Sequence, residues 1–391
     1  MKPLNIIIAA TEYPPNTIAG SGRYVLNLIS KIKKDHNITI ISPIINKELC
    51  KEDKSVKVIR LEIPNLPFVD KRMLFSLELN KYLNHLDLSK YDILHVVGSV
   101  DASFIDYKRL RNRIRTIISP TDHYGLITSW NPFKSSYFSS DFLFRYFYYN
   151  LLKYFTKNAL RNCDKILVTC DYMLNLITNL CSIKKDKILV IHRGVDIGKF
   201  KVDVKKNKYS SHNVLFVGYN MERKGVIYLI NAAIEIIKKV PDVKFTIIGN
   251  CSRNYRGKIN RFIERQEISK HFEFLDYVNP DDVLKYYRDS NLFVMIPLIE
   301  TFGQVYAEAL VTRTPVIGSD TGGVSEIVNI RNGVLVKPKD IKAISNAAIS
   351  ILLDPKRAKE MGINGRKKVL NEYSLEQMVK KTVDVYKELV L

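Results

Sequence analysis

The sequence offers little that is typical of metal, redox or disulfide-stabilised proteins. Its five cysteines are odd in number and scattered, and no two of them form the CxxC pair of metal and redox sites. We therefore expect reduced thiols. The cysteines are Cys50, Cys163, Cys170, Cys181 and Cys251. No Asp-x-Asp triplet and no His/Cys cluster supplies ligands for an ion, so we expect neither a metal nor a cofactor.

Long apolar runs are also absent from the sequence. The first run, Ile6–Ala10, ends before Glu12 and is too short for a signal-peptide core or for a membrane span. There is no low-complexity tract, and 46% hydrophobic with 26% charged residues is a globular composition. We expect a cytoplasmic protein, and 391 residues favour two domains.

Acidic residues are too few to balance the basic ones. The formal net charge is +21 and the pI is about 9.5, which creates attraction to nucleic acid, anionic lipid or anionic substrates. The sequence has no zinc-finger spacing, no RNP-like aromatic strand and no basic region with heptads. Nucleic acid is therefore not an expected partner, and phosphate-bearing substrates and anionic membranes remain.

Short apolar runs alternate with helical stretches along the whole chain, which indicates doubly wound parallel sheets. In the first half the predicted strands are Leu4–Ala10, Ile38–Ile41, Ile93–Val97, Ile114–Ile118 and Lys165–Thr169. In the second half they are Asn213–Gly218, Lys244–Gly249, Phe272–Leu275, Leu292–Ile296 and Pro315–Gly318. The lysine-rich passage Lys205–His212 is interpreted as a linker. We predict two Rossmann-like domains, residues 1–200 and 206–370, followed by an amphipathic helix over 374–391.

The strongest chemical signal is a pair of glutamates eight positions apart, Glu300 and Glu308. If a helix begins near Gly303, Glu300 lies in the loop that follows the Leu292–Ile296 strand, and Glu308 lies in the second turn. The first amides of that helix, at Gly303–Val305, are suited to an anion. The carboxylates are suited to polyol hydroxyls. The alternative, two solvated charges that flank a helix start, stays open on spacing alone.

This segment resembles the donor-binding signature of the retaining family 4 glycosyltransferases (glycosyl transferases group 1). The matching residues are Glu300, Phe302, Gly303, Glu308, Ala309 and Pro315. The resemblance extends over nearly the whole chain, at the Pro14-Pro15 to Gly20-Ser21-Gly22 loop, Cys163-Asp164 to Thr169, Gly194-Val195-Asp196 with Phe200, Val217-Gly218 with Lys224-Gly225, Gly322-Gly323 with Glu326, and Gly333 to Pro338 with Asp340. It implies an α/β GT-B fold, in which two Rossmann-like domains face each other across a cleft and the C-terminal helix over 374–391 packs back on the first domain.

The resemblance also implies roles for individual residues. Glu300 would hold the transferred sugar, Glu308 the donor ribose, and Lys224 the diphosphate leaving group. The implied donor-binding set is Gly20, Gly22, Gly218, Arg223, Lys224, Thr301, Phe302, Gly303, Gln304, Val305 and Glu308. The co-substrate would be a nucleotide sugar, with UDP or GDP as the expected nucleoside diphosphate, and transfer would proceed with retention to a glycan or lipid-linked acceptor.

Three positions depart from the family pattern. Tyr219 stands where the family has an arginine, and Arg223 is the candidate substitute for that phosphate contact. Arg313 stands where a glycine is usual. The family's His-Asp pair corresponds to Thr121-Asp122, with His123 displaced, so either Asp122 or His123 could face the reacting sugar. The alternative is a turn in which Asp122 caps a helix.

The segment 137–155 is dense in aromatic residues and is bordered by Lys134, Lys153, Lys157 and Arg161. Two interpretations stay open: a packed helix of the acceptor domain, or an element that contacts an anionic membrane. Two other functions also compete with glycosyl transfer, namely a catalytically degenerate nucleotide-sugar-binding protein and a GT-B nucleotide-sugar epimerase. His95 is expected to be a packed or hydrogen-bonded core residue.

Overall fold

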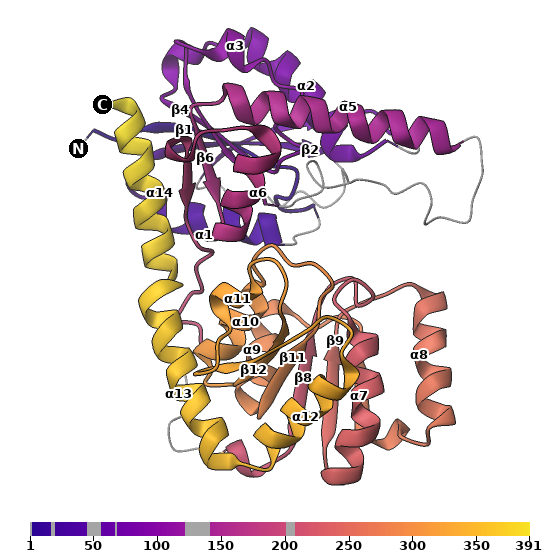
Figure 1. Cartoon of the computed structure of the whole chain (residues 1–391). Coiled ribbons are helices and arrows are strands. Elements are labelled where there is room, and N and C mark those ends of the chain that lie inside the picture. The colour runs from indigo at the N-terminus through magenta and orange to yellow at the C-terminus, as the bar shows by residue number, and fades with distance from the viewer. Residues whose placement is uncertain (1, 17–19, 45–55, 67–68, 122–140, 201–207) are drawn as a thin grey trace. The chain divides into compact units, whose positions relative to one another are not determined.

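The computed structural model describes the chain except residues 1, 17–19, 45–55, 67–68, 122–140 and 201–207, and it also leaves out the side chains of 141–147 and 280–281. The chain forms two compact α/β units (Figure 1). The first contains Met1–His192 together with Met378–Leu391, and the second contains Arg193–Gln377. The second unit thus begins at Arg193, before the domain boundary predicted at residue 206, and the last residues of the chain belong to the first unit.

The first unit is built on a parallel sheet in the order β3-β2-β1-β4-β5-β6-β7. Five strands lie where sequence analysis predicts them, because each is an apolar run buried on both faces. The unpredicted β3 and β7 are the two edge strands, one half-exposed and one of three residues. The strands are β1 Asn5–Ala9, β2 Asn37–Ile44, β3 Lys57–Glu62, β4 Ile93–Val97, β5 Arg115–Ser119, β6 Lys165–Val168 and β7 Ile188–Val190.

Helices flank this sheet (Figure 1). They are α1 Gly20–Ile32, α2 Lys71–His85, α3 Tyr107–Leu110, α5 Asp141–Asn162, α6 Asp171–Cys181 and α14 Leu375–Val390. The C-terminal helix α14 is fixed to the sheet by a buried polar chain: His95 lies 2.6 Å from the Tyr386 hydroxyl and 2.7 Å from that of Ser119. Burial lowers the pKa of His95 to about 3. His95 is therefore a neutral core residue, as expected.

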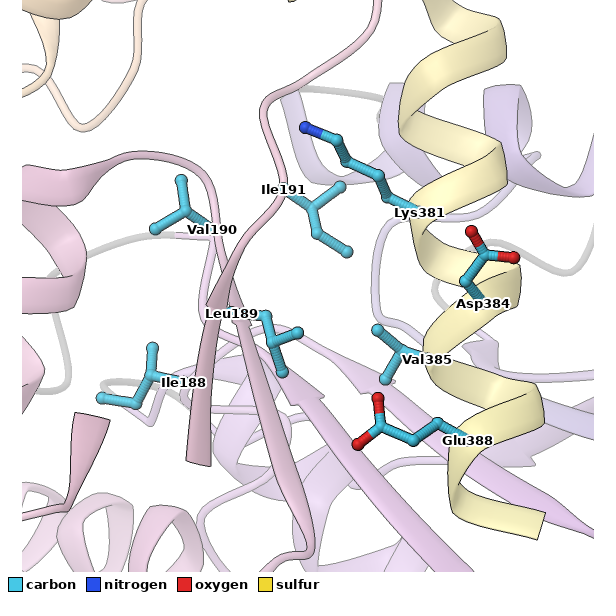
Figure 2. A pocket seen from close by; sticks show the side chains of 8 residues that line it. All are labelled: Ile188, Leu189, Val190, Ile191, Lys381, Asp384, Val385 and Glu388. Atoms are coloured by element: carbon cyan, nitrogen blue, oxygen red, sulfur yellow. The ribbon is translucent and has the colours of Figure 1, made fainter. Parts of the chain in front are cut away.

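A groove runs between the edge strand β7 and α14 (Figure 2). Apolar side chains of Ile188–Ile191 form one wall, and Lys381, Asp384, Val385 and Glu388 form the other. Glu388 also pairs with Lys165 at 3.2 Å. None of the residues predicted to act on a substrate lines this groove, so it is separate from the site described below.

The second unit repeats the same winding in a parallel sheet of the order β10-β9-β8-β11-β12-β13. The strands are β8 Asn213–Val217, β9 Lys244–Ile248, β10 Phe272–Leu275, β11 Leu292–Met295, β12 Val316–Ser319 and β13 Gly333–Val336. The helices are α7 Val226–Lys239, α8 Arg253–Arg265, α9 Pro280–Asp289, α10 Gln304–Val311, α11 Val324–Ile327, α12 Ile341–Leu352 and α13 Pro355–Glu372. The two sheets together confirm the predicted α/β fold class.

Lys208 and Tyr209 belong to the passage interpreted as a linker, but they lie within the second unit and are both buried. The Lys208 ammonium donates to the Thr314 hydroxyl at 2.6 Å and to the Thr312 carbonyl at 3.1 Å. A buried ammonium needs such partners, because desolvation otherwise penalises its charge. Since the acceptors lie more than 100 residues away along the chain, composition alone does not reveal them.

The cysteines agree with the expected reduced state wherever the structure describes them. Cys163, Cys170 and Cys181 are buried free thiols, and Cys251 is a half-buried one. Burial raises the pKa of Cys163 to about 12, so this thiol is inert at neutral pH.

Candidate functional site

In each unit the strand order reverses between two neighbouring strands, which are β8 and β11 in the second unit. Ligands of open α/β sheets bind outside the carboxyl ends of strands at such a switch point. Lys224 lies in the loop after β8, and Glu300 lies in the loop after β11. The switch point therefore brings together two residues that the sequence separates by 76 positions.

Lys224 and Glu300 form an ion pair in which the ammonium donates to Oε2 of the carboxylate. Both side chains are largely buried, with 14% and 8% exposure. Burial alone raises the pKa of Glu300, but the neighbouring charge and hydrogen bond of Lys224, together with Arg223 and the Thr301 amide, lower it overall. Glu300 is therefore ionised at neutral pH, with its charge balanced by Lys224.

The backbone around Glu300 is held by a turn that requires glycine. Gly322 has a φ of +57°, and a Cβ there would lie 1.7 Å from the Glu300 carbonyl oxygen. That carbonyl accepts a hydrogen bond from the Gly323 amide at 3.1 Å. The Glu300 carboxylate in turn accepts from the Thr301 amide at 3.1 Å. The position of the carboxylate is thus fixed by the backbone as well as by Lys224.

Helix α10 begins directly after this loop, as predicted, with Gly303 as its N-cap at a left-handed φ of +81°. No described residue accepts a hydrogen bond from the amides of Gln304 or Val305. Because the first amides of a helix lack intrahelical acceptors, they favour an anion. Buried Phe302 packs on Tyr373, with ring centroids 5.8 Å apart.

Glu308 lies in the second turn of α10 and is buried. Its Oε2 accepts a hydrogen bond from the hydroxyl of Tyr287 at 3.0 Å. Tyr287 lies on α9 and is completely buried. Tyr287 was not among the predicted site residues. In the sequence it looks like any other apolar position of a helix, because the partner of its hydroxyl is not visible there.

Two of the departures from the family pattern, Tyr219 and Arg313, lie in the second unit, together with the candidate substitute Arg223. Tyr219 is 61% exposed and lies at the carboxyl end of β8, beside Gly218. Arg223 is close enough for its charge to lower the pKa of Glu300. Arg313 adopts a left-handed φ of +62°, the conformation for which glycine is favoured, and its carbonyl accepts from the Tyr209 hydroxyl at 2.7 Å.

The predicted site residues of the first unit are placed only in part. The prediction that Gly20 and Gly22 lie in a loop is wrong, because both belong to the first turn of α1. The Gly22 amide donates to the Glu12 carboxylate at 2.9 Å, so this helix start is capped by the chain itself. Asp122 and His123 lie outside the described residues, and so do 137–140 of the aromatic segment.

No described helix combines the length and the apolar character that a membrane crossing requires. Within the same described residues, no three His, Cys, Asp or Glu side chains are grouped so that they could hold a metal ion.

Comparison with known proteins places this architecture in a family. The model of Glycosyltransferase Family 4 matches residues 18–199, and the model of Glycosyl transferases group 1 matches residues 199–368. Together the two models span residues 18–368 and meet at residue 199, a few residues after the second unit begins at Arg193. The fold and the matches define a glycosyltransferase of the GT-B class, and the chain belongs to the family 4 glycosyltransferases.

Individual proteins agree with this assignment. An uncharacterised glycosyltransferase of Methanocaldococcus jannaschii is 25% identical over 98% of both chains. Sucrose-phosphate synthase from Thermosynechococcus elongatus has a similar fold, with a TM-score of 0.79, 20% identity and 99% coverage of both chains. Anabaena HepE, solved in complex with UDP-glucose, has a TM-score of 0.74 and 13% identity, and the match covers 98% of this chain and 100% of HepE.

Proposed function

We propose that this protein transfers a sugar, with retention, from a nucleoside-diphosphate sugar to an acceptor hydroxyl of a glycan or lipid-linked glycan. The observation that carries the proposal is the buried Lys224–Glu300 pair at the switch point of the second sheet. Beside it, the amides that open α10 suit a diphosphate. The UDP-glucose complex of HepE, a protein of the same fold, supports a nucleotide sugar as the donor.

In this proposal each group acts on a defined part of the donor. Lys224 and Arg223 stabilise the negative charge that develops on the diphosphate, together with the amides of Gln304 and Val305. Glu300 accepts hydrogen bonds from hydroxyls of the transferred sugar, and Glu308 from those of the ribose. The bond from the anomeric carbon to the phosphate oxygen breaks with its electron pair on the diphosphate. The acceptor oxygen bonds that carbon from the same face, and its proton passes to the departing diphosphate.

A thermal-shift screen against UDP-, GDP-, ADP- and TDP-sugars tests the donor, because a ligand that binds the native state raises its stability. A shift with one nucleoside class that disappears in Glu308→Ala supports the site, whereas no shift with any donor contradicts it. Product analysis follows for the donor that binds. Transfer to an acceptor supports the proposal; epimerised donor, or binding without transfer or hydrolysis, indicates one of the competing functions instead.

We also propose that the protein works at the inner face of an anionic membrane. On α5, buried Leu152 and half-buried Phe155 attach the helix to its unit, and the Phe155 ring centroid lies 4.6 Å from that of Phe104. Leu151 and Tyr154 are 50% and 67% exposed on the same helix. Exposed apolar and aromatic side chains among lysines suit an anionic interface.

Vesicle flotation tests this second proposal. The protein should float with vesicles that contain phosphatidylglycerol but not with pure phosphatidylcholine, and Leu151→Ser/Tyr154→Ser should reduce the floated fraction. The matched control is Leu353→Ser, which changes an exposed leucine of the other unit. Equal flotation of all three proteins would contradict a role for α5.

A further inference from the structure

Tyr287 is a core tyrosine whose hydroxyl is hydrogen-bonded to a buried carboxylate of the proposed site. The hydroxyl donates to Glu308 at 3.0 Å, and both residues are buried. A hydrogen bond from a neutral donor to a carboxylate is stronger than one between neutral groups. The contact therefore fixes which way the Glu308 carboxylate faces.

Tyr287 is itself held from several sides. Its carbonyl accepts from the Thr314 hydroxyl at 2.8 Å, from the Thr312 hydroxyl at 3.3 Å and from the Lys208 ammonium at 3.5 Å. These bonds satisfy a carbonyl of the last turn of α9, where helical carbonyls lack intrahelical partners. The Tyr287 ring also packs on Phe293, with centroids 5.8 Å apart. The phenol therefore has little freedom to turn away from Glu308.

We propose that Tyr287 is a positioning residue that acts through Glu308 and thereby sets the enzyme's preference for a ribose over a deoxyribose nucleotide. Lys208, Thr312 and Thr314 hold Tyr287, and Tyr287 holds the carboxylate. The inference rests on the proposed function, in which Glu308 accepts from the ribose hydroxyls. A carboxylate free to rotate would still be present but would meet those hydroxyls less often in the productive geometry.

The test measures the affinity of the full-length protein for UDP and for 2′-deoxy-UDP by calorimetry, or for GDP and 2′-deoxy-GDP if the donor screen selects guanosine. The ratio of the two affinities is the readout, because it does not depend on the fraction of protein that is folded. The variants are Tyr287→Phe, which keeps the ring, and Glu308→Gln. Tyr209→Phe is the matched control, since the Tyr209 hydroxyl also makes one hydrogen bond within the second unit, to the Arg313 carbonyl.

We expect the wild type and Tyr209→Phe to prefer the ribonucleotide on the order of tenfold, the effect of one good hydrogen bond to a charged group. Tyr287→Phe and Glu308→Gln should each lower that preference to about twofold or less. The double variant Tyr287→Phe/Glu308→Gln should have the same affinity ratio as Glu308→Gln alone, because the effects of coupled residues are not additive. Loss of preference in Glu308→Gln but not in Tyr287→Phe overturns the positioning role alone. An unchanged preference in Glu308→Gln, or no nucleotide binding by the wild type, overturns the ribose assignment of the proposed function.

Discussion

The two sheets share one winding order, yet their switch points are occupied differently. In the first unit, Asp101, after β4, accepts from both the amide and the hydroxyl of Thr11, after β1. In the second unit, Glu300, after β11, is paired with the ammonium of Lys224, after β8. A buried carboxylate thus bridges the switch point in both units, with a threonine as its partner in the first and a lysine ammonium in the second.

The helices that begin beside the two switch points also differ in the acceptors of their first amides. The first turn of α1 donates to Glu12, a carboxylate of the chain itself, whereas no described residue accepts from the Gln304 and Val305 amides at the start of α10. The Gly22 amide of α1 thus has an acceptor within the chain, whereas the first amides of α10 lie beside the Lys224–Glu300 pair and suit an anion. The same strand order therefore places different side chains at its two switch points, and the proposed phosphate contacts belong to the second.

Removal of the cation should have the largest effect. Lys224→Met leaves the Glu300 carboxylate buried and without its ammonium partner, which should cost about 3 kcal/mol of unfolding free energy. It also removes the charge that balances the diphosphate in the proposed function, so transfer should fall about 100-fold or more. Urea unfolding and initial rates measure the two effects. The matched change in the first unit, Thr11→Val, should cost only about 1–2 kcal/mol and leave nucleotide affinity unchanged. Equal effects of the two substitutions on nucleotide affinity would remove the distinction between the switch points.

A methyl group on Gly322 should have the next largest effect. Gly322→Ala places a Cβ against the Glu300 carbonyl at a left-handed φ, so we expect a loss of about 2–4 kcal/mol in unfolding free energy and a displaced Glu300. Gly20→Ala is the matched control at the start of α1, because no described atom lies within 4 Å of its Cβ. That variant should stay within about 1 kcal/mol of the wild type. Chemical denaturation compares the two, and similar losses would contradict the tight packing around Glu300.

Acid should weaken the second unit through Glu300. Its folded pKa lies below the ordinary value of 4.5, so its contribution to stability is complete above that value and is lost as the pH falls through the folded pKa. The difference in unfolding free energy between the wild type and Lys224→Met/Glu300→Gln should therefore be constant from pH 7 to 5 and decrease below 4.5. Unfolding curves across this range measure it, and a difference independent of pH would mean that Glu300 is not ionised in the folded protein.

The smallest expected effect comes from placing a carboxylate at the start of α10, as Glu12 does at the start of α1. Gln304→Glu places a carboxylate at the helix N-terminus, which should stabilise the free protein by about 0.5 kcal/mol and weaken diphosphate binding about tenfold through repulsion. Gln304→Met is the uncharged control. Calorimetry with UDP or GDP measures the affinity, and a similar loss in both variants would point to a contact of the glutamine rather than to charge at the helix start.

The sequence by itself determined the alternation of strands and helices, the two-domain class and the Glu300–Glu308 signature, because buried parallel strands and a helix start leave local patterns. It did not determine the edge strands β3, β7 and β13, which are too short or too exposed to show such a pattern. The start of α1 at Gly20 was also not predicted, because the acceptor for the Gly22 amide is Glu12, which lies ten residues earlier in the sequence.

Only the tertiary structure decided which residues meet at the site. Lys224 reaches Glu300 because the strand order reverses between β8 and β11, and Tyr287 reaches Glu308 from another helix. Lys208, which composition assigns to a linker, is buried against Thr312 and Thr314. These pairings depend on strand order and packing over long separations, and a local pattern of residues carries no record of either.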